Sequence, residues 1–164
     1  MLTVRLSKLV MVAGLALFAL LVAADNVADY GSNEAFVRHV LAMDTTFPQN
    51  ALRWRAVTDP GLQTAAYWLI IAAEALTGAL FGVAALVMAA RLRAPKPRFR
   101  AAVPWVAAGA ALAFALWFVG FMMVGGEWFL MWQSSTWNGQ EAAFRFYLTV
   151  LAVSAYVLLD TGEG

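Results

Sequence analysis

The segment Arg91-Leu-Arg-Ala-Pro-Lys-Pro-Arg-Phe-Arg100 decides the fold, because it is a short basic link between two long apolar runs. It holds five of the eleven lysine and arginine residues and no acidic residue. The runs beside it, residues 64–90 and 101–125, are each long enough to cross a bilayer as a helix. Basic loops between membrane spans stay on the cytoplasmic side. The link therefore predicts the orientation of every other segment.

The composition is that of an integral membrane protein. Of the 164 residues, 63% are hydrophobic and 13% are charged, whereas soluble domains carry about 25% charged residues. We expect a single membrane domain over residues 1–164, since the chain is short for two domains. The net charge of +1 gives no indication of nucleic-acid binding. The absence of cysteine and the single histidine exclude disulfides, thiolate metal sites and a haem held by two histidines of this chain.

Two further apolar runs complete a set of four predicted spans. In the first run, the basic heads of Arg5 and Lys8 are expected to reach toward the membrane surface. A cleaved signal peptide is the alternative for this run, because it has a basic start, an apolar stretch and the small residues Val22-Ala-Ala24. The four runs predict an all-α integral membrane four-helix bundle with these spans: residues 6–24, 64–90, 101–125 and 142–159.

The basic residues are unevenly distributed over this arrangement. With the amino terminus inside, seven of the eleven lie on the inner side, namely Arg5, Lys8 and the five of the link. The other four lie outside among acidic residues: Arg38, Arg53, Arg55 and Arg145. This distribution predicts that both termini are cytoplasmic. Residues 25–63 and 126–141 then form two outer loops.

The first outer loop contains an amphipathic segment over residues 33–43. Its apolar side chains recur at helical spacing and share one face: Phe36, Val37, Val40 and Leu41. Ser32 is placed to cap the start of such a helix. The segment is too short to span a membrane, so it predicts a surface helix that lies along the membrane or covers the bundle.

An internal repeat relates the two halves of the chain. The second and fourth spans are entered through Gln63-Thr-Ala-Ala-Tyr67 and Gln140-Glu-Ala-Ala-Phe144. The match predicts two parallel hairpins related by an axis along the membrane normal, with the surface helix inserted in the first. Chance similarity between alanine-rich segments is the alternative. If the repeat is real, residues 6–24 correspond to a retained span, which argues against cleavage.

Glu74 is the only charged residue in the run of residues 64–90. It lies about 15 Å from the outer end of that helix. A carboxylate in hydrocarbon is costly, so it must face the bundle, be protonated or meet a partner. Arg145, Tyr67 and Thr77 are the candidate partners. The two interpretations are a proton or substrate site and a neutral hydrogen-bonded contact between helices.

The same run contains Gly78-Ala-Leu-Phe-Gly82, in which two glycines four residues apart form a flat strip on the helix. Such strips allow another helix backbone to approach closely. Packing within the bundle is the expected use of the strip. Homodimerisation through it is the alternative.

The outer loops are rich in tryptophan, arginine and amide side chains. We predict an outer rim, a binding surface for anionic headgroups, a quinone ring or a protein partner, with these members: Arg53, Trp54, Arg55, Trp132, Trp137 and Gln140. An ordinary aromatic belt at the membrane interface is the alternative. His39 with Asp44 is too small a donor set for a metal site.

Three short motifs together resemble a known family. They are Asn50-Ala-Leu-Arg-Trp-Arg55, the embedded Glu74, and Trp137-Asn-Gly-Gln140. With the basic first span, they make the chain similar to a family of small four-span bacterial integral membrane proteins of unknown function. The resemblance implies a multi-pass protein of the bacterial inner (plasma) membrane. It implies no activity, ligand or catalytic residue.

We expect a non-catalytic accessory or scaffold subunit of a membrane complex, which contacts the lipid bilayer and a protein partner or a second copy of itself. The alternative is a small oligomeric transporter or channel in which Glu74 is the coupling residue. A membrane enzyme or quinone-reactive subunit is a third hypothesis, and it depends on the outer rim alone. The sequence predicts no catalytic residue, cofactor, metal site or nucleic-acid partner.

Overall fold

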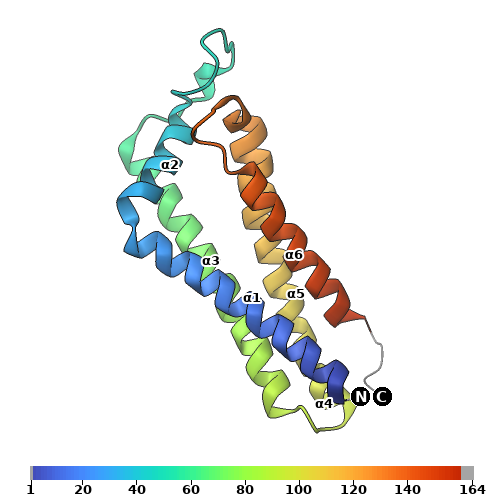
Figure 1. The fold of residues 1–164 in the computed structure, drawn as a ribbon. Helices are drawn as coiled ribbons and strands as arrows, with labels where there is room; N and C mark the ends of the chain where they lie inside the picture. Colours follow the sequence, from blue (N-terminus) through green and yellow to red (C-terminus); the bar gives the residue numbers. More distant parts are fainter. Residues whose placement is uncertain (1, 160–164) are drawn as a thin grey trace.

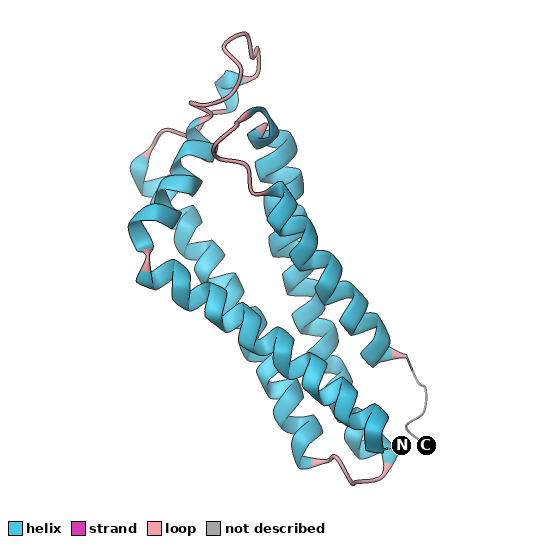
Figure 2. Cartoon of the chain, in the orientation of Figure 1, coloured by secondary structure: helices cyan, strands magenta, loops and turns pink. Residues whose placement is uncertain are grey.

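The computed structural model describes residues 2–159, which are mostly helical and contain no strand (Figures 1 and 2). Four helical stretches in this range are long and apolar enough to cross a membrane: Leu2–Ala28, Pro60–Ala90, Lys96–Trp128 and Gln140–Leu158. They coincide with the four predicted spans to within a few residues at each end. The predicted all-α membrane bundle is therefore confirmed.

Two of the long stretches run in one direction and two run back (Figure 1). α1 (Leu2–Ala28) starts at the same end as the third stretch, and α3 (Pro60–Ala90) and α6 (Gln140–Leu158) return to that end. α1 packs on α3, α3 packs on the third stretch, and that stretch packs on α6. The chain thus forms two hairpins with the same direction.

The third stretch changes its helical type along its length. It comprises α4 (Lys96–Phe99), η2 (Arg100–Ala102), α5 (Val103–Phe114) and η3 (Ala115–Trp128). η3 is π-helical, so its N–H groups bond to carbonyls five residues earlier, and the bond from Phe129 N to Val124 O (2.9 Å) continues this pattern. π-Helical turns occur mostly singly and often beside functional sites. An ordinary helix was expected here, and no feature of the sequence predicted the wider coil.

The main core lies between the four long stretches and contains small and branched side chains from each of them. Its most deeply buried members include Val12, Ala19, Phe81, Ala84, Val106, Ala113, Val150 and Val157. In a lipid surrounding, close packing rather than removal from water holds such helices together. α1 therefore contributes to the same core as the other three stretches.

Gly78 lies where α3 and α1 approach each other closely. A Cβ atom at Gly78 would lie 2.7 Å from Leu20 Cγ and 3.0 Å from the Leu20 backbone nitrogen. A Cβ at Gly82 would meet no atom of the described residues within 4 Å. The first glycine of the predicted strip is thus used for packing inside the chain, as expected.

The basic end of the bundle, formed by residues 91–100 and the first turns of α1, is tied together by buried cations. Arg5 Nη1 donates to the carbonyls of Leu92 (3.0 Å) and Ala94 (2.6 Å). Lys8 Nζ donates to the carbonyls of Val157 (3.2 Å) and Leu159 (2.8 Å). These carbonyls follow or end α3 and α6, where helices leave acceptors without an internal partner.

The expectation that Arg5 and Lys8 extend toward the membrane surface is wrong. Arg5 is 9% exposed and Lys8 is fully buried. Both side chains turn inward because the open carbonyls at the ends of α3 and α6 offer acceptors, and cations are also favoured at helix carboxyl ends.

The loop end, formed by residues 43–59 and 129–139, lies opposite the basic end (Figure 1). α2 (Tyr30–Ala42) connects α1 to this end and buries Val37 and Val40. The predicted Ser32 cap is wrong, since α2 begins at Tyr30 and its cap residue Asp29 makes no side-chain cap bond. Backbone hydrogen bonds continue from α1 into α2, including the bond from Asp29 N to Asp25 O (2.9 Å). The start of α2 therefore does not need a side-chain cap. That α2 lies along the membrane surface stays a prediction.

Candidate functional site

Glu74 lies near the middle of α3 and is only 2% exposed. The side-chain amide of Asn26, in the last turn of α1, donates to Glu74 Oε2 at 2.7 Å. Tyr67 lies two turns before Glu74 on the same face of α3, and its hydroxyl donates to the backbone carbonyl of Asn26 at 2.6 Å. The three residues form one chain of hydrogen bonds that joins α1 to α3.

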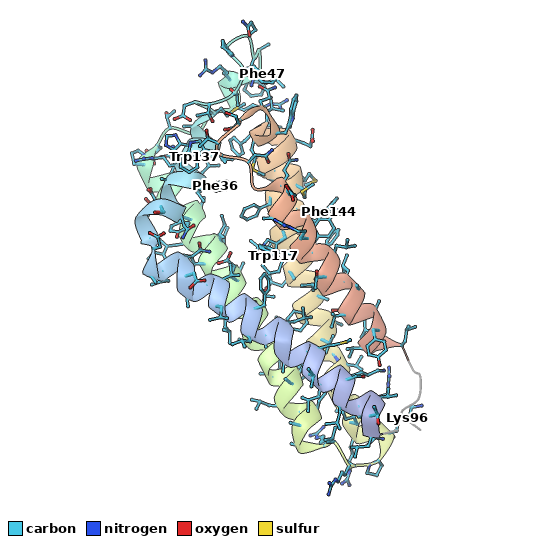
Figure 3. The ribbon with its side chains drawn as sticks, viewed as in Figure 1. Phe36, Phe47, Lys96, Trp117, Trp137 and Phe144 are labelled. Carbon is cyan, nitrogen blue, oxygen red and sulfur yellow. The ribbon has the colours of Figure 1, made fainter. Side chains whose placement is uncertain are left out.

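A cavity of about 170 Å³ lies beside this chain of hydrogen bonds, and we call it the Glu74 cavity. α1, α2, α3, η3 and α6 each contribute to its wall. The lining residues are Val22, Asn26, Asn33, Phe36, Val37, Tyr67, Ile70, Glu74, Trp117, Phe121, Gly139, Ala142, Ala143 and Phe146. Figure 3 shows Phe36 near the loop end and Trp117 further toward the middle of the bundle, so the cavity lies in the half nearer the loop end.

Aromatic rings make up much of the wall of the Glu74 cavity. Trp117 and Phe146 meet edge to face with their centroids 5.5 Å apart. Phe36 and Phe121 stack with their centroids 6.3 Å apart. Among residues 2–159, the polar side-chain groups of the lining residues are one carboxyl, two amides, one phenol and one indole N–H, which belong to Glu74, Asn26, Asn33, Tyr67 and Trp117.

A second space of about 170 Å³, which we call the apolar chamber, adjoins the Glu74 cavity beneath α2. The two spaces share four lining residues: Phe36, Val37, Ile70 and Phe121. Every other residue on its wall is apolar or glycine, including Leu41 and Val124. The apolar face predicted for the amphipathic segment therefore lines this chamber, together with residues in the 120–125 segment of η3.

The described wall of the Glu74 cavity carries one acidic side chain and no basic side chain. Among residues 2–159, no arginine or lysine lines it. The group that contacts Glu74 Oε2 is a neutral amide. A carboxylate that is shielded from water and lacks a cation is costly, so the site favours either a proton or a cation on Glu74.

Arg145 does not meet Glu74. Its side chain is 66% exposed and lies 3.8 Å from Glu141 on the same helix. It lines a separate groove between α1 and α6, together with Gly14 and Val153. Thr77, the third predicted partner, is buried with no hydrogen-bond partner for its hydroxyl among the described residues. Tyr67 alone of the three joins the network, and it does so through Asn26.

Asn26 is the residue of this site that the sequence analysis missed. It was assigned to the polar loop because the first apolar run ends at residue 24. The buried stripe of α1 includes Val12, Ala19 and Ala23, and continuing it by three residues reaches Asn26. This spacing was the signal that could have placed Asn26 on the bundle side of the helix.

The residues of the predicted outer rim all lie at the loop end, but they form separate contacts. The Arg55 guanidinium carbon lies 4.4 Å from the Trp128 ring centroid and 5.5 Å from that of Trp54. Arg55 Nη1 also donates to the Trp128 carbonyl at 3.3 Å. Trp54 itself is 72% exposed, and Arg53 beside it is exposed too.

The other rim residues contact different partners. Trp132 packs edge to face on Phe47, with centroids 5.9 Å apart. Trp137 stacks on His39 at 4.7 Å, and His39 Nδ1 lies 2.7 Å from Asp44 Oδ2. Gln140 begins α6, and Figure 3 shows Trp137 beside Phe36. Within residues 2–159, no cluster of three metal-binding side chains occurs.

Residues 4–160 match the sequence model of a family described as predicted small integral membrane protein (DUF2165). The chain belongs to the DUF2165 family. Neither a curated protein nor a solved structure matches it. Membership in DUF2165 confirms the resemblance drawn from the sequence. Together with the four apolar helices, it establishes the protein as an integral membrane protein.

The geometry limits what the Glu74 carboxyl of the DUF2165 protein can do. The carboxyl is held by Asn26, and it faces a space bounded by aromatic rings. Such a group can accept a hydrogen bond, take up a proton or balance a positive charge. The counterpart of Glu74 in the proposed repeat is Leu151, which is 38% exposed on α6. The two hairpins of the DUF2165 protein therefore differ at this position.

Proposed function

We propose that this protein binds a small ligand within the membrane, in the Glu74 cavity, and that it does so without catalysis. The observation that carries the proposal is a buried carboxyl that faces a cavity and contacts a neutral amide. A purely structural contact between α1 and α3 would not require open space beside it. Ligand sites in helix bundles have this form, an apolar wall with a few placed polar groups.

The size of the cavity supports this proposal. A water molecule takes about 30 Å³ in the liquid, so about 170 Å³ exceeds what one bridging water would fill. The apolar chamber adds a second space of similar size across Phe36 and Phe121.

A pair of probes with one shape tests the proposal: hexyltrimethylammonium and its uncharged isostere, in which carbon replaces nitrogen. We expect at least one of them to bind the purified protein, measured by isothermal titration calorimetry in detergent. Ala142→Leu should weaken that binding because Ala142 lines the cavity. Ala155→Leu is the matched control on the exposed face of α6. The proposal is wrong if neither probe binds in a way that depends on residue 142.

The transporter or channel hypothesis extends this proposal by one step, in which the cavity opens to each side of the membrane in turn. Glu74 would then be the coupling residue. In proteoliposomes, Glu74→Gln should abolish flux of hexyltrimethylammonium while the variant still elutes as a folded protein. Equal flux through both proteins would contradict the hypothesis that Glu74 couples transport. It would not contradict ligand binding in the Glu74 cavity.

A role as an accessory or scaffold subunit is a second candidate function, favoured by the exposed Trp54 beside Arg55. Tryptophan and arginine are enriched where proteins associate. Extraction in mild detergent should then give a complex larger than the 17.8 kDa chain. Trp54→Ser should reduce it, whereas Trp105→Ser, an exposed tryptophan at the basic end, should not. A monomer in several detergents would count against this role.

A further inference from the structure

We propose that the ligand of the Glu74 cavity is a monovalent organic cation, an ammonium group that carries apolar substituents. This inference rests on the proposed function, since it names the chemical class of the ligand for the same cavity. The observations behind it are the charge of the wall, the aromatic rings on it and the shape of the two adjoining spaces.

The charge of the wall selects against anions and gives a cation its partner. Glu74 is the single carboxyl on the wall, and no arginine or lysine of residues 2–159 stands beside it there. Asn26 donates to Oε2 but carries no charge to balance. Attraction between opposite charges grows as the surrounding dielectric falls. A bound cation would therefore complete an ion pair that the chain itself leaves incomplete in this cavity.

The aromatic wall selects for a soft cation rather than a metal ion. The faces of tryptophan, tyrosine and phenylalanine attract cations within about 6 Å of the ring centroid, and quaternary ammonium ligands are bound in this way. Trp117, Phe121, Phe146 and Tyr67 all line the cavity with Glu74. One carboxyl and two amides supply few of the oxygen ligands that Ca²⁺ or Mg²⁺ requires.

The hydrogen bonds around Glu74 make it a fixed acceptor. The Tyr67 hydroxyl is bonded to the Asn26 carbonyl, and the Asn26 amide is bonded to Glu74 Oε2. These bonds tie the carboxyl to the last turn of α1. A group that is already oriented loses little freedom when a ligand binds, which favours affinity. Tyr67 and Asn26 are thus positioning residues for the carboxyl.

The apolar chamber determines what the cation carries. It adjoins the Glu74 cavity through Phe36, Val37, Ile70 and Phe121, and its wall has almost no polar surface. These four side chains give the Glu74 cavity an apolar wall on the side of the chamber, and the rings of Phe36 and Phe121 stack within it. An ammonium head beside Glu74 would therefore meet this wall with an apolar substituent. A polar substituent would be left without hydrogen-bond partners there.

The same two probes test the inference, because a quaternary ammonium keeps its charge at every pH. We expect wild-type protein to bind hexyltrimethylammonium at least about tenfold more tightly than the uncharged isostere, a difference of about 1.4 kcal/mol. Glu74→Gln should remove that preference, so that the two probes bind the variant with equal affinity. Glu141→Gln, which removes an exposed carboxylate on α6, should change neither affinity.

The outcomes separate this inference from the proposed function. If wild-type protein binds both probes equally and Ala142→Leu weakens both, the inference that the ligand is a cation is wrong. The proposal that the Glu74 cavity binds a ligand is then supported. No binding of either probe that depends on residue 142 would overturn both. The wild-type comparison stands even if Glu74→Gln fails to fold, because it uses two probes and one protein.

Discussion

Asn26 is one amide on α1, and it determines how the acid of α3 is held. Glu74 could be identified from the sequence because a carboxyl inside an apolar run is conspicuous, and it is buried as expected. Its partner could not, since the contact depends on how far α1 continues and how it is rotated against α3. The most conspicuous candidate cation, Arg145, points away and lies near Glu141. Charge complementarity alone was therefore a poor guide to a contact between helices.

The Asn26–Glu74 bond should contribute measurably to stability. Asn26→Leu is expected to lower the free energy of unfolding by about 1–3 kcal/mol, because a buried acceptor loses its donor. The measurement is reversible unfolding in mixed micelles with increasing sodium dodecyl sulfate. Asn33→Leu, which changes another amide on the same cavity wall, should have a smaller effect. In a double-mutant cycle, Asn26→Leu and Glu74→Leu, which removes the acceptor, should couple by about 0.5–3 kcal/mol. Additive effects would show that the bond is not formed.

At the scale of elements, the four spans were predictable and their details were not. Long apolar runs and the basic link are strong signals, because a bilayer requires about 20 apolar residues per helix. The π-helical form of η3 was invisible, since residues 115–128 are apolar on nearly every face and show no change of period. η3 contributes Phe121 to both spaces and Val124 to the apolar chamber. One of the five elements that line the Glu74 cavity thus has a helical form that the hydrophobic periodicity did not predict.

The two glycines of the α3 strip should respond differently to the same change. Gly78→Ala is expected to lower the free energy of unfolding by about 1–3 kcal/mol, because the new methyl group would overlap Leu20, including its backbone. Gly82→Ala, one turn further along the same strip, is the matched control, because a methyl group there would meet no atom of the described residues within 4 Å. Unfolding in mixed micelles compares the two. Equal losses at both positions would mean that the strip also packs against a second molecule.

At the scale of the whole molecule, the sequence predicted an orientation that the fold makes testable. The basic end holds the link and the start of α1, and the loop end holds residues 43–59 and 129–139 (Figure 1). The charge distribution predicts a cytoplasmic location for the basic end. The internal repeat predicted parallel hairpins, and the directions of the four stretches agree with it. The insertion of α2 and the polar contacts at Glu74 then make the first hairpin different from the second.

The orientation can be measured with single cysteines, since the chain contains none. Gln49→Cys at the loop end should react with a membrane-impermeant maleimide in intact spheroplasts. Arg93→Cys at the basic end should react only after the membrane is permeabilised. Both positions are exposed, so access to the reagent depends on the side of the membrane. The reverse pattern would place the basic link outside and contradict the prediction.

The buried Lys8 also has a consequence for the order of assembly during synthesis. Lys8 and Val157 are 149 residues apart in the chain. At about 5–20 residues per second, the lysine is made roughly 7–30 seconds before the carbonyls that accept its hydrogen bonds. During that interval, the Lys8 ammonium cannot form its hydrogen bonds to the carbonyls of Val157 and Leu159. The last turn of α6 therefore completes the structure that the first turns of α1 begin, and the molecule closes as a unit only when its final helix has been inserted.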